Sequence, residues 1–433
     1  MPDWTAWPFP VEDPYPAYRA ARETGPVQWH EGLGATLVLS HEPAEAILRN
    51  PGDWSSDPRN SPEMLAALGG EGPMAELWGR SLLSSDPPEH TRLRRAVSRF
   101  FTPRAMRAIT DRVQSIVAVA LEALDDGEPV ELMSQLAYPI PLAVIAELFD
   151  VGVEGAQLLR SETPALARVL ELDPTPEILE AAGTAAMTLM LFLTPLLAER
   201  RSNPGEDLLS ALIHAAGGVE LQTAEIMSLC LLLLAAGHET TANLIGNGTN
   251  ALLQHPDQFA WLRANPDRIA QAVEELLRYD SPAQVASRAA RQDLKLGPLD
   301  VQRGQQVLVI LGAANRDPAR HPDPDRLDLT RQEAQTHLAF GHGPHFCLGA
   351  GLARLEAAAT FTQLGRSARR LELERSQHCQ DQSRTLRRLQ ALHVGASSDR
   401  LAGTVTPPPR SPRKGESQSH PQRCERAESG TPP

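Results

Sequence analysis

The sequence predicts a mainly helical fold with a small β region. Ala, Leu, Glu and Arg dominate the 433 residues, and apolar residues recur at helical spacing along most of the chain. Strand patterns are few and short. Hydrophobic residues make up 42% of the chain and aromatic residues only 4%, so the core is expected to consist mainly of Leu, Ala and Val. We therefore expect one large helical domain with a short sheet beside it.

The expected helices follow from apolar periodicity and from capping residues. Pro43 and Pro103 each stand in a first helical turn, and Thr102 is the expected N-cap before Pro103. A break around residues 203–207, which contains Pro and Gly, separates two further helices. The expected helices cover residues 44–49, 102–124, 139–148, 184–201, 208–215 and 223–254, and a last one follows Gly349.

Two segments have the pattern of strands. They are residues 35–39 (ATLVL) and residues 306–311 (QVLVIL). Residues 315–337 are rich in Pro and Asp and predict an ordered loop. Residues 403–433 have no apolar periodicity and are rich in Pro, Ser and charge, which predicts a disordered tail after a domain of residues 1–402.

Composition excludes several classes of protein. The formal charge of -13 argues against a nucleic-acid partner. The four cysteines form no CxxC pair, so neither a disulfide framework nor a zinc site is expected. The N-terminus lacks the pattern of a signal peptide, and the longest apolar run, residues 229–237, is about half the length of a membrane span. A cytoplasmic protein without a membrane span is expected.

The segment FGHGPHFCLG, residues 340–349, places one cysteine among three glycines, a proline and two histidines. Gly341, Gly343 and Gly349 permit positive φ angles and a close approach of the backbone to a large flat group. Cys347 stands just before a helix, where backbone N–H groups lower the pKa of a thiol. Such a thiolate is a nucleophile, a redox group or a metal ligand, and a buried cysteine in a tight turn is the alternative without function.

The complete pattern FGxGxHxCxG resembles the haem-ligand loop of the cytochrome P-450 monooxygenases. The resemblance implies that Cys347 is the axial thiolate of haem b, iron protoporphyrin IX, and pushes electron density onto the iron. Backbone N–H groups around Leu348 and Gly349 would tune that push. It also implies that Phe340 packs near the porphyrin and that His345 reaches a propionate.

The segment AGHETT, residues 236–241, lies midway along the longest expected helix. A polar patch on a buried helix is one interpretation of it. It resembles the oxygen-activation segment of the same family, with Ala236 and Gly237 at a weakened point of the helix that holds O2 and water. Glu239 and Thr240 would then be the catalytic residues that deliver protons through water.

Glu275 and Arg278 are three residues apart, which places both on one helical face. A surface ion pair is the usual meaning of that spacing. The resemblance implies a buried, structural ExxR pair instead, with Arg326 as its partner from the loop PDPDRLDLTR. Leu327 departs from the aromatic residue that is common in the family at that place.

His90 and Arg94 are four residues apart on one expected helix, where a basic surface helix is the alternative interpretation. The resemblance implies that both bind haem propionates, together with Arg288 and His345. Four donors for two carboxylates are a reasonable number.

The resemblance covers about residues 9–395 and implies a single-domain cytochrome P-450 fold of the soluble bacterial type. It implies a monooxygenase that inserts one atom of O2 into a hydrophobic small molecule, by hydroxylation or epoxidation. Electrons would come from a ferredoxin and a ferredoxin reductase, with Arg95, Arg99 or Arg354 as docking residues. The expected pocket segments lie near residues 60–83, 165–175, 232–236, 283–286 and 389–392 and are mainly aliphatic.

Two other functions are compatible with the same motifs. A peroxide-driven peroxygenase would keep the haem, although the Glu239–Thr240 pair favours O2 and redox partners. A haem-binding or ligand-binding protein without turnover would be expected to have lost one of the motifs, and each of them is intact.

Overall fold

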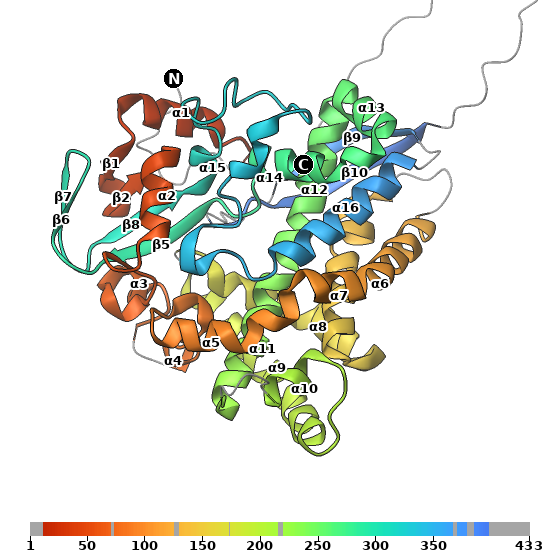
Figure 1. The fold of residues 1–433 in the computed structure, drawn as a ribbon, viewed down its shortest axis with the longest axis horizontal. Helices are drawn as coiled ribbons and strands as arrows, with labels where there is room; N and C mark the ends of the chain where they lie inside the picture. Colours follow the sequence, from red (N-terminus) through yellow and green to blue (C-terminus); the bar gives the residue numbers. More distant parts are fainter. Residues whose placement is uncertain are drawn as a thin grey trace, which may run out of the picture. The chain divides into compact units, whose positions relative to one another are not determined.

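A computed structural model describes residues 12–70, 73–124, 130–172, 174–214, 220–366, 370–378 and 385–397. Helices form most of this part of the chain (Figure 1). They are α1 (Tyr15–Thr24), α2 (His41–Arg49), α3 (Pro62–Ala66), α4 (Pro73–Gly79), α5 (Glu89–Ser98), α6 (Pro103–Glu122), α7 (Pro139–Phe149), α8 (Gly152–Ala167), α9 (Pro176–Ser202), α10 (Leu208–Ile213), α11 (Thr223–Gly237), α12 (Glu239–Gln254), α13 (Pro256–Ala264), α14 (Ile269–Tyr279), α15 (Leu311–Ala314) and α16 (Ala350–Arg366).

The strands form three small sheets. The largest has the order β1-β2-β8-β5-β3, in which β2 and β8 are parallel and the other neighbours are antiparallel. A second sheet has the order β4-β10-β9, and β6 pairs with β7. The strands are β1 (Val27–His30), β2 (Ala35–Val38), β3 (Trp54–Ser55), β4 (Val130–Glu131), β5 (Val285–Ala290), β6 (Leu294–Leu296), β7 (Leu299–Val301), β8 (Gln306–Ile310), β9 (Arg370–His378) and β10 (Leu389–Ser397).

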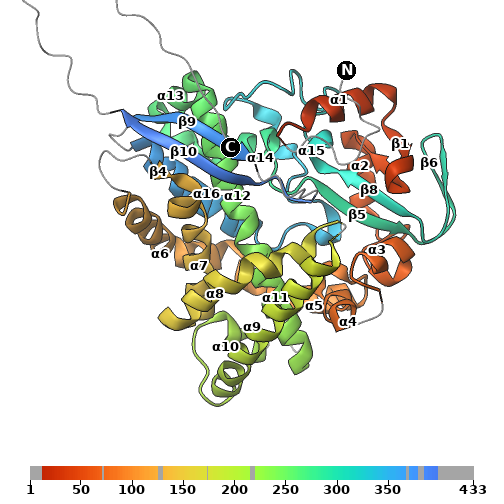
Figure 2. The ribbon, with the colours of Figure 1, turned by 180° about the vertical axis from the view of Figure 1, so that it is seen from behind.

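Two hydrophobic clusters meet along the axis of α11 and α12. Apolar residues of α11 pack with those of α7, α8 and α9, whereas those of α12 pack with α6, α14, α16 and β10. The view from behind shows α8, α9 and α11 together and β9 and β10 running beside α12 (Figure 2). The junction of the two helices therefore lies where one cluster ends and the other begins.

The expected mainly helical fold with a small β region is confirmed, and Thr102 caps α6 through a hydrogen bond that its Oγ1 accepts from the Ala105 N–H, 3.3 Å. The helix expected over residues 223–254 is interrupted at His238, so it forms α11 and α12. The helix expected from residue 184 begins at Pro176. Strands β5, β9 and β10 and helix α8 were not expected, because their apolar patterns are weak and their neighbours in the fold decide them.

Two helical stretches are long and apolar enough to cross a membrane by length and composition alone, α9 and the stretch Thr223–Gln254. Of their most apolar windows, 33% and 78% of the residues are buried within the protein. Buried core helices pass this test too, so it is weak evidence for a membrane span. The expected tail, residues 403–433, and the N-terminal residues 1–11 lie outside the described residues.

Candidate active site

The loop before α16 presents Cys347 at the start of that helix. The Cys347 N–H donates to the Phe340 carbonyl oxygen, 2.8 Å, which closes the loop on itself. Phe340 is half-buried and lies under the Arg354 guanidinium, 4.6 Å from its ring centre. Solvent reaches the Cys347 side chain, whereas Ala350, three residues further on, is buried. The thiol is thus held at a helix start with one side open.

Two glycines of this loop have positive φ angles, +67° at Gly341 and +69° at Gly343. A Cβ at Gly343 would lie 2.4 Å from the Leu48 carbonyl oxygen of α2, a distance that no side chain tolerates. Gly343 therefore permits a close approach to the backbone of α2, whereas the sequence predicted an approach to a large flat group. Gly349 has an ordinary φ, and its N–H donates to the Cys347 sulfur.

The expected lowering of the Cys347 pKa is wrong for this structure. Although one side of the Cys347 side chain is exposed, the protein atoms packed around the sulfur desolvate it and raise the pKa of the thiol. The Gly349 N–H, Arg94 and Arg354 oppose that rise without reversing it. Burial is the larger effect because the helix start supplies only partial charges. Binding of a metal ion removes the proton from such a thiol.

Four basic side chains gather beside Cys347. The rings of His90, on α5, and His345 are 4.1 Å apart, centre to centre. Arg94 and Arg288 act on the charge of both histidines, and Arg94 also acts on Cys347. The structure therefore brings together the four residues that the sequence assigned to propionate binding.

Without a bound ligand, burial disfavours the charged forms of these basic side chains. Burial first, and then the neighbouring positive charges, lowers the pKa of His345 to about 2, and burial lowers that of Arg288 to about 10. Among the described residues, neither arginine has a carboxylate within ion-pair distance, and Nε2 of both His90 and His345 is buried without a hydrogen bond. A buried guanidinium such as that of Arg288 requires an anionic partner, and the buried histidine nitrogens require a hydrogen-bond partner. A ligand with two carboxylates fits this cluster.

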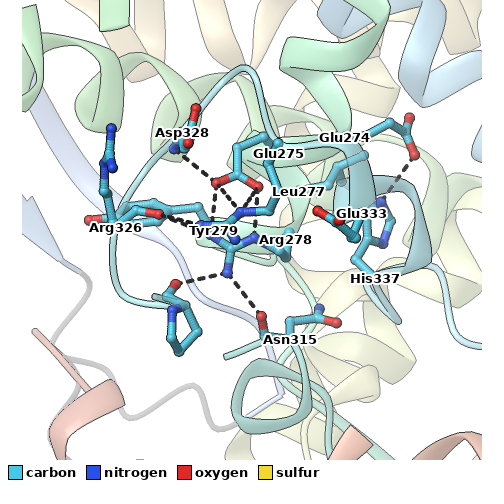
Figure 3. A network of polar contacts seen from close by, with 12 residues as sticks. Glu274, Glu275, Leu277, Arg278, Tyr279, Asn315, Arg326, Asp328, Glu333 and His337 are labelled. Atoms are coloured by element: carbon cyan, nitrogen blue, oxygen red, sulfur yellow. Dashed lines mark hydrogen bonds and ion pairs between the residues drawn. The ribbon is translucent and has the colours of Figure 1, made fainter. Parts of the chain in front are cut away.

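The ExxR pair is a buried network rather than a surface pair (Figure 3). Arg278 Nε and Nη2 donate to the two Glu275 oxygens at 2.7 and 2.8 Å, and both side chains are fully buried. Arg278 also donates to the carbonyl oxygens of Asn315, Pro324 and Arg326. The pair thereby holds the irregular segment that precedes the Cys347 loop.

The second guanidinium on Glu275 belongs to Arg331, and the expectation of Arg326 is corrected. Arg331 Nε donates to Glu275 Oε1 at 3.2 Å, and the Arg331 side chain is buried. Arg326 is exposed and contributes its carbonyl oxygen. The flanking Leu327 and Leu329 are buried and face inward, which turns the Arg326 side chain toward solvent.

A second ion pair joins α14 to α16 beside the same loop. Arg354 Nε and Nη2 donate to the two Glu274 oxygens at 2.6 and 2.8 Å, and His337 Nε2 lies 3.3 Å from Glu274 Oε2. Burial raises the Glu274 pKa, but the hydrogen bonds from Arg354 and His337 outweigh it and lower the pKa to about 2. Arg354 is thus already engaged, which weakens its expected role in docking a redox partner.

The Glu274 pKa predicts a specific pH dependence of stability. Because the folded-state pKa, about 2, is below the ordinary 4.5, ionised Glu274 stabilises the fold above pH 4.5 and this contribution is lost as the pH falls toward 2. We expect Glu274→Gln to lower the free energy of unfolding by about 1–3 kcal/mol at neutral pH, where one pKa unit corresponds to about 1.4 kcal/mol. Urea unfolding of both proteins between pH 3 and 7 measures this, and a difference that does not shrink below pH 4.5 would contradict it.

The helix break lies within the expected oxygen-activation segment. Thr240 Oγ1 donates to the Ala236 carbonyl oxygen at 2.9 Å, across the break at His238. Ala236, Gly237 and Thr240 are half-buried, whereas His238 and Glu239 are buried. Ala236 packs against the same hydrophobic cluster as Leu348, the neighbour of Cys347. Both motifs therefore border one hydrophobic cluster.

Sequence reasoning missed a chain of charges that begins at Glu239. Arg388 Nη1 donates to Glu239 Oε1 and Arg388 Nη2 to Glu171 Oε1, each at 3.0 Å. The three side chains are buried, with exposed fractions of 2% to 8%. Arg388 and Glu171 lie in or next to segments expected to be mainly aliphatic. The pair Arg387-Arg388, directly before the apolar strand β10, was the available signal.

Comparison with known protein sequences agrees with the family that the motifs resemble. Residues 157–367 match the model of the family described as "Cytochrome P450". The chain is 42% identical to the cytochrome P450 monooxygenase PikC of Streptomyces venezuelae, over 80% of this chain and 81% of that protein. It is 39% identical to the 6-deoxyerythronolide B hydroxylase of Saccharopolyspora erythraea, over 84% and 90%.

Comparison with solved structures gives the same family as the sequence comparison. The crystal structure of P450BioI, in complex with an acyl carrier protein carrying hexadec-9Z-enoic acid, superimposes with a TM-score of 0.82 at 33% identity, over 89% of this chain and 98% of that one. An acid-binding basic cluster beside a cysteine at a helix start is what a haem with a thiolate ligand requires. With identity above 30% over most of both chains, this protein belongs to the cytochrome P-450 family and is a bacterial-type haem-thiolate monooxygenase that uses O2.

Proposed function

We propose that Cys347 ligates the haem iron and that His90, Arg94, Arg288 and His345 hold the two propionates. The observation that carries this proposal is the basic cluster beside Cys347, in which His90 and Arg288 are buried and Arg94 and His345 half-buried, and in which neither arginine forms an ion pair with a carboxylate of the described residues. Two propionates would offset two arginine charges and satisfy the two buried histidine nitrogens. Phe340, Gly341 and Gly349 shape the loop around the sulfur, with a Gly349 N–H bond that tunes it.

When bound, the haem activates O2 with two electrons and two protons and transfers one oxygen atom to the substrate. The chain supplies position and protons. The Gly349 N–H stabilises charge on the Cys347 sulfur, and Arg94 adds a positive charge nearby. The networks of Glu275 and Glu274 hold the segment before Cys347 and the helix after it, so that the sulfur is fixed.

Protons are proposed to reach the site through Glu239 and Thr240. Glu239 is buried at the first position of α12, and its Oε2 has no hydrogen bond to the described residues. Thr240 Oγ1 has its proton engaged with the Ala236 carbonyl oxygen, so its lone pairs remain available to accept a hydrogen bond from a water. A carboxylate and a hydroxyl at one helix break can pass a proton along such a water.

Thr240→Ala tests this part of the proposal. Without the hydroxyl, nothing orients the water at the helix break, and we expect less product and more hydrogen peroxide for each electron consumed. The effect is expected to be roughly tenfold on the ratio of peroxide to product, below the full 10²–10⁴ of general acid catalysis. Thr240→Ser, which keeps the hydroxyl, is the control, and an unchanged ratio in the alanine variant would remove Thr240 from proton delivery.

The substrate is proposed to be a bulky, apolar small molecule of secondary metabolism, which is hydroxylated or epoxidised. The expected pocket segments are aliphatic. The name of the relative from Saccharopolyspora erythraea, 6-deoxyerythronolide B hydroxylase, supports hydroxylation as the reaction. A spin-state shift of the haem on addition of such compounds would identify the class.

A ferredoxin and its reductase are proposed to supply the electrons, in the cytoplasm. Arg95 is exposed on α5 and remains a candidate for docking, whereas Arg99 donates to the Ala211 carbonyl oxygen and Arg354 is paired with Glu274. If hydrogen peroxide alone supports turnover as fast as the reconstituted electron-transfer system, the protein is a peroxygenase instead.

The carbon monoxide difference spectrum of the reduced protein tests the ligand. Thiolate ligation predicts the strongly red-shifted Soret band that electron donation by sulfur produces. A band at the shorter wavelength of histidine-ligated haem would mean that the thiolate is lost or protonated. Absence of a haem band would overturn the assignment of Cys347.

A further inference from the structure

The chain of charges at Glu239 joins three segments that are distant in sequence. Glu239 opens α12, Arg388 directly precedes β10, and Glu171 follows the short helix η6 (Arg168–Leu170) in the connection between α8 and α9. One guanidinium therefore bridges two carboxylates, each at 3.0 Å, and all three side chains are buried. We refer to these residues as the Glu171–Arg388–Glu239 chain.

The geometry constrains the two Glu239 oxygens differently. Oε1 accepts a hydrogen bond from Arg388, whereas Oε2 is buried, has no hydrogen bond to the described residues and lies 4.0 Å from His238 Nε2. Burial lowers the pKa of His238, more than Glu239 raises it, so this histidine is neutral near pH 7. Arg388 is then the cation that holds the Glu239 carboxylate in place, and Oε2 is the oxygen free to exchange a proton.

Arginine is the residue type suited to this position. Its planar group donates in fixed directions to two acceptors at once, which a lysine ammonium on a flexible stem does not reproduce. Removal of either carboxylate takes one negative charge away from the buried guanidinium of Arg388. The Arg388 side chain is then expected to move. The position of Glu239 therefore depends on Glu171 through Arg388, which donates a hydrogen bond to each of them.

We propose that Arg388 is a positioning residue for the proton donor Glu239, and that Glu171 couples its orientation to the connection between α8 and α9. A displacement of that connection would withdraw Arg388 from Glu239 and turn the carboxylate away from its working orientation. The inference rests on the proposed role of Glu239 in proton delivery, and the experiment below separates the two.

Three substitutions on the intact holoprotein test the chain: Glu239→Gln, Arg388→Lys and Glu171→Gln. Arg387→Lys is the matched control, because Arg387 is the adjacent residue and is also buried in an ion pair, with Asp280. We expect Arg388→Lys and Glu171→Gln to lower the product formed per electron and to change the solvent deuterium isotope effect on turnover. The loss for Arg388→Lys is expected to be roughly tenfold, less than the 10²–10⁴ attributable to a general acid itself.

A second readout does not depend on turnover. Hydrogen–deuterium exchange of the resting protein, followed in a peptide spanning residues 168–178, reports whether Glu171 is still held by Arg388. Arg388→Lys and Glu171→Gln are expected to speed exchange there, and Arg387→Lys is not. The double variant Glu171→Gln/Arg388→Lys is expected to be no worse than Arg388→Lys, because both changes break one linked set of contacts.

The outcomes are distinguishable. If Glu239→Gln couples electrons to product as well as the parent protein does, the proposed role of Glu239 fails. If Glu239→Gln is impaired while Arg388→Lys and Glu171→Gln match the parent in coupling, isotope effect and exchange, the inference is overturned. Additive effects in the double variant, or equal impairment by Arg387→Lys, would overturn it too. Glu171→Gln, which keeps the shape of the side chain, decides the matter should Arg388→Lys not fold.

Discussion

Replacing Glu275 by glutamine is expected to lower the free energy of unfolding by roughly 3–5 kcal/mol, the cost of leaving a buried charge without its partner. Glu275 accepts hydrogen bonds from Arg278, Arg331 and the Asp328 N–H, and it has no solvent exposure. Its loss leaves two guanidinium groups without their shared carboxylate. Since whole domains are stable by only about 5–15 kcal/mol, this loss is a large fraction of the total.

Urea unfolding followed by circular dichroism, together with haem content after purification, measures this effect. Glu274→Gln is the matched control, because the neighbouring carboxylate also binds an arginine but Arg354, its partner, is 36% exposed and can be rehydrated. A Glu275→Gln protein as stable as Glu274→Gln would show that the network is not the buried anchor of the segment between Asn315 and Arg331.

Replacing Cys347 by serine is expected to abolish monooxygenation. Serine is a weak electron donor to iron and cannot supply the push that O–O cleavage requires. Haem retention is expected to fall only in part, because the propionate cluster of His90, Arg94, Arg288 and His345 stays intact. The carbon monoxide difference spectrum of the variant should then lack the red-shifted band.

Cys230→Ala is the control for this experiment. Cys230 lies on α11, is completely buried and has a pKa raised to about 12 by burial, so it remains a protonated thiol. Its replacement should leave the red-shifted band in place. A red-shifted band that survives in Cys347→Ser and disappears in Cys230→Ala would reverse the assignment of the ligand.

Local sequence patterns were sufficient for the elements that carry the chemistry. Helical periodicity and the capping residues Thr102 and Pro103 predicted α6 to within two residues. The loop around Cys347 was recognisable by its resemblance to the haem-ligand loop of the family, and two of its glycines, Gly341 and Gly343, have the positive φ angles that the sequence predicted. The spacing of Glu275 and Arg278 was equally informative, because residues three apart on a helix meet whatever surrounds them.

Contacts between distant segments were not predictable in this way. Arg326 and Arg331 are only five residues apart, and the burial of Leu327 and Leu329 decides which of the two faces Glu275. Desolvation by the protein atoms packed around the Cys347 sulfur also reversed the expected direction of its pKa shift. Charge and solvation at a buried site depend on every element packed around it.

The mainly helical fold and the motifs that resemble the cytochrome P-450 family could be identified from the sequence alone, because both depend on residue type and local spacing. The packing of the helices and strands decided that the basic side chains of α5, β5 and the Cys347 loop gather in one cluster, and that Arg388 links Glu239 to Glu171. An ion pair between residues 149 or 217 positions apart leaves no local pattern, since its partners meet only when the helices and strands pack.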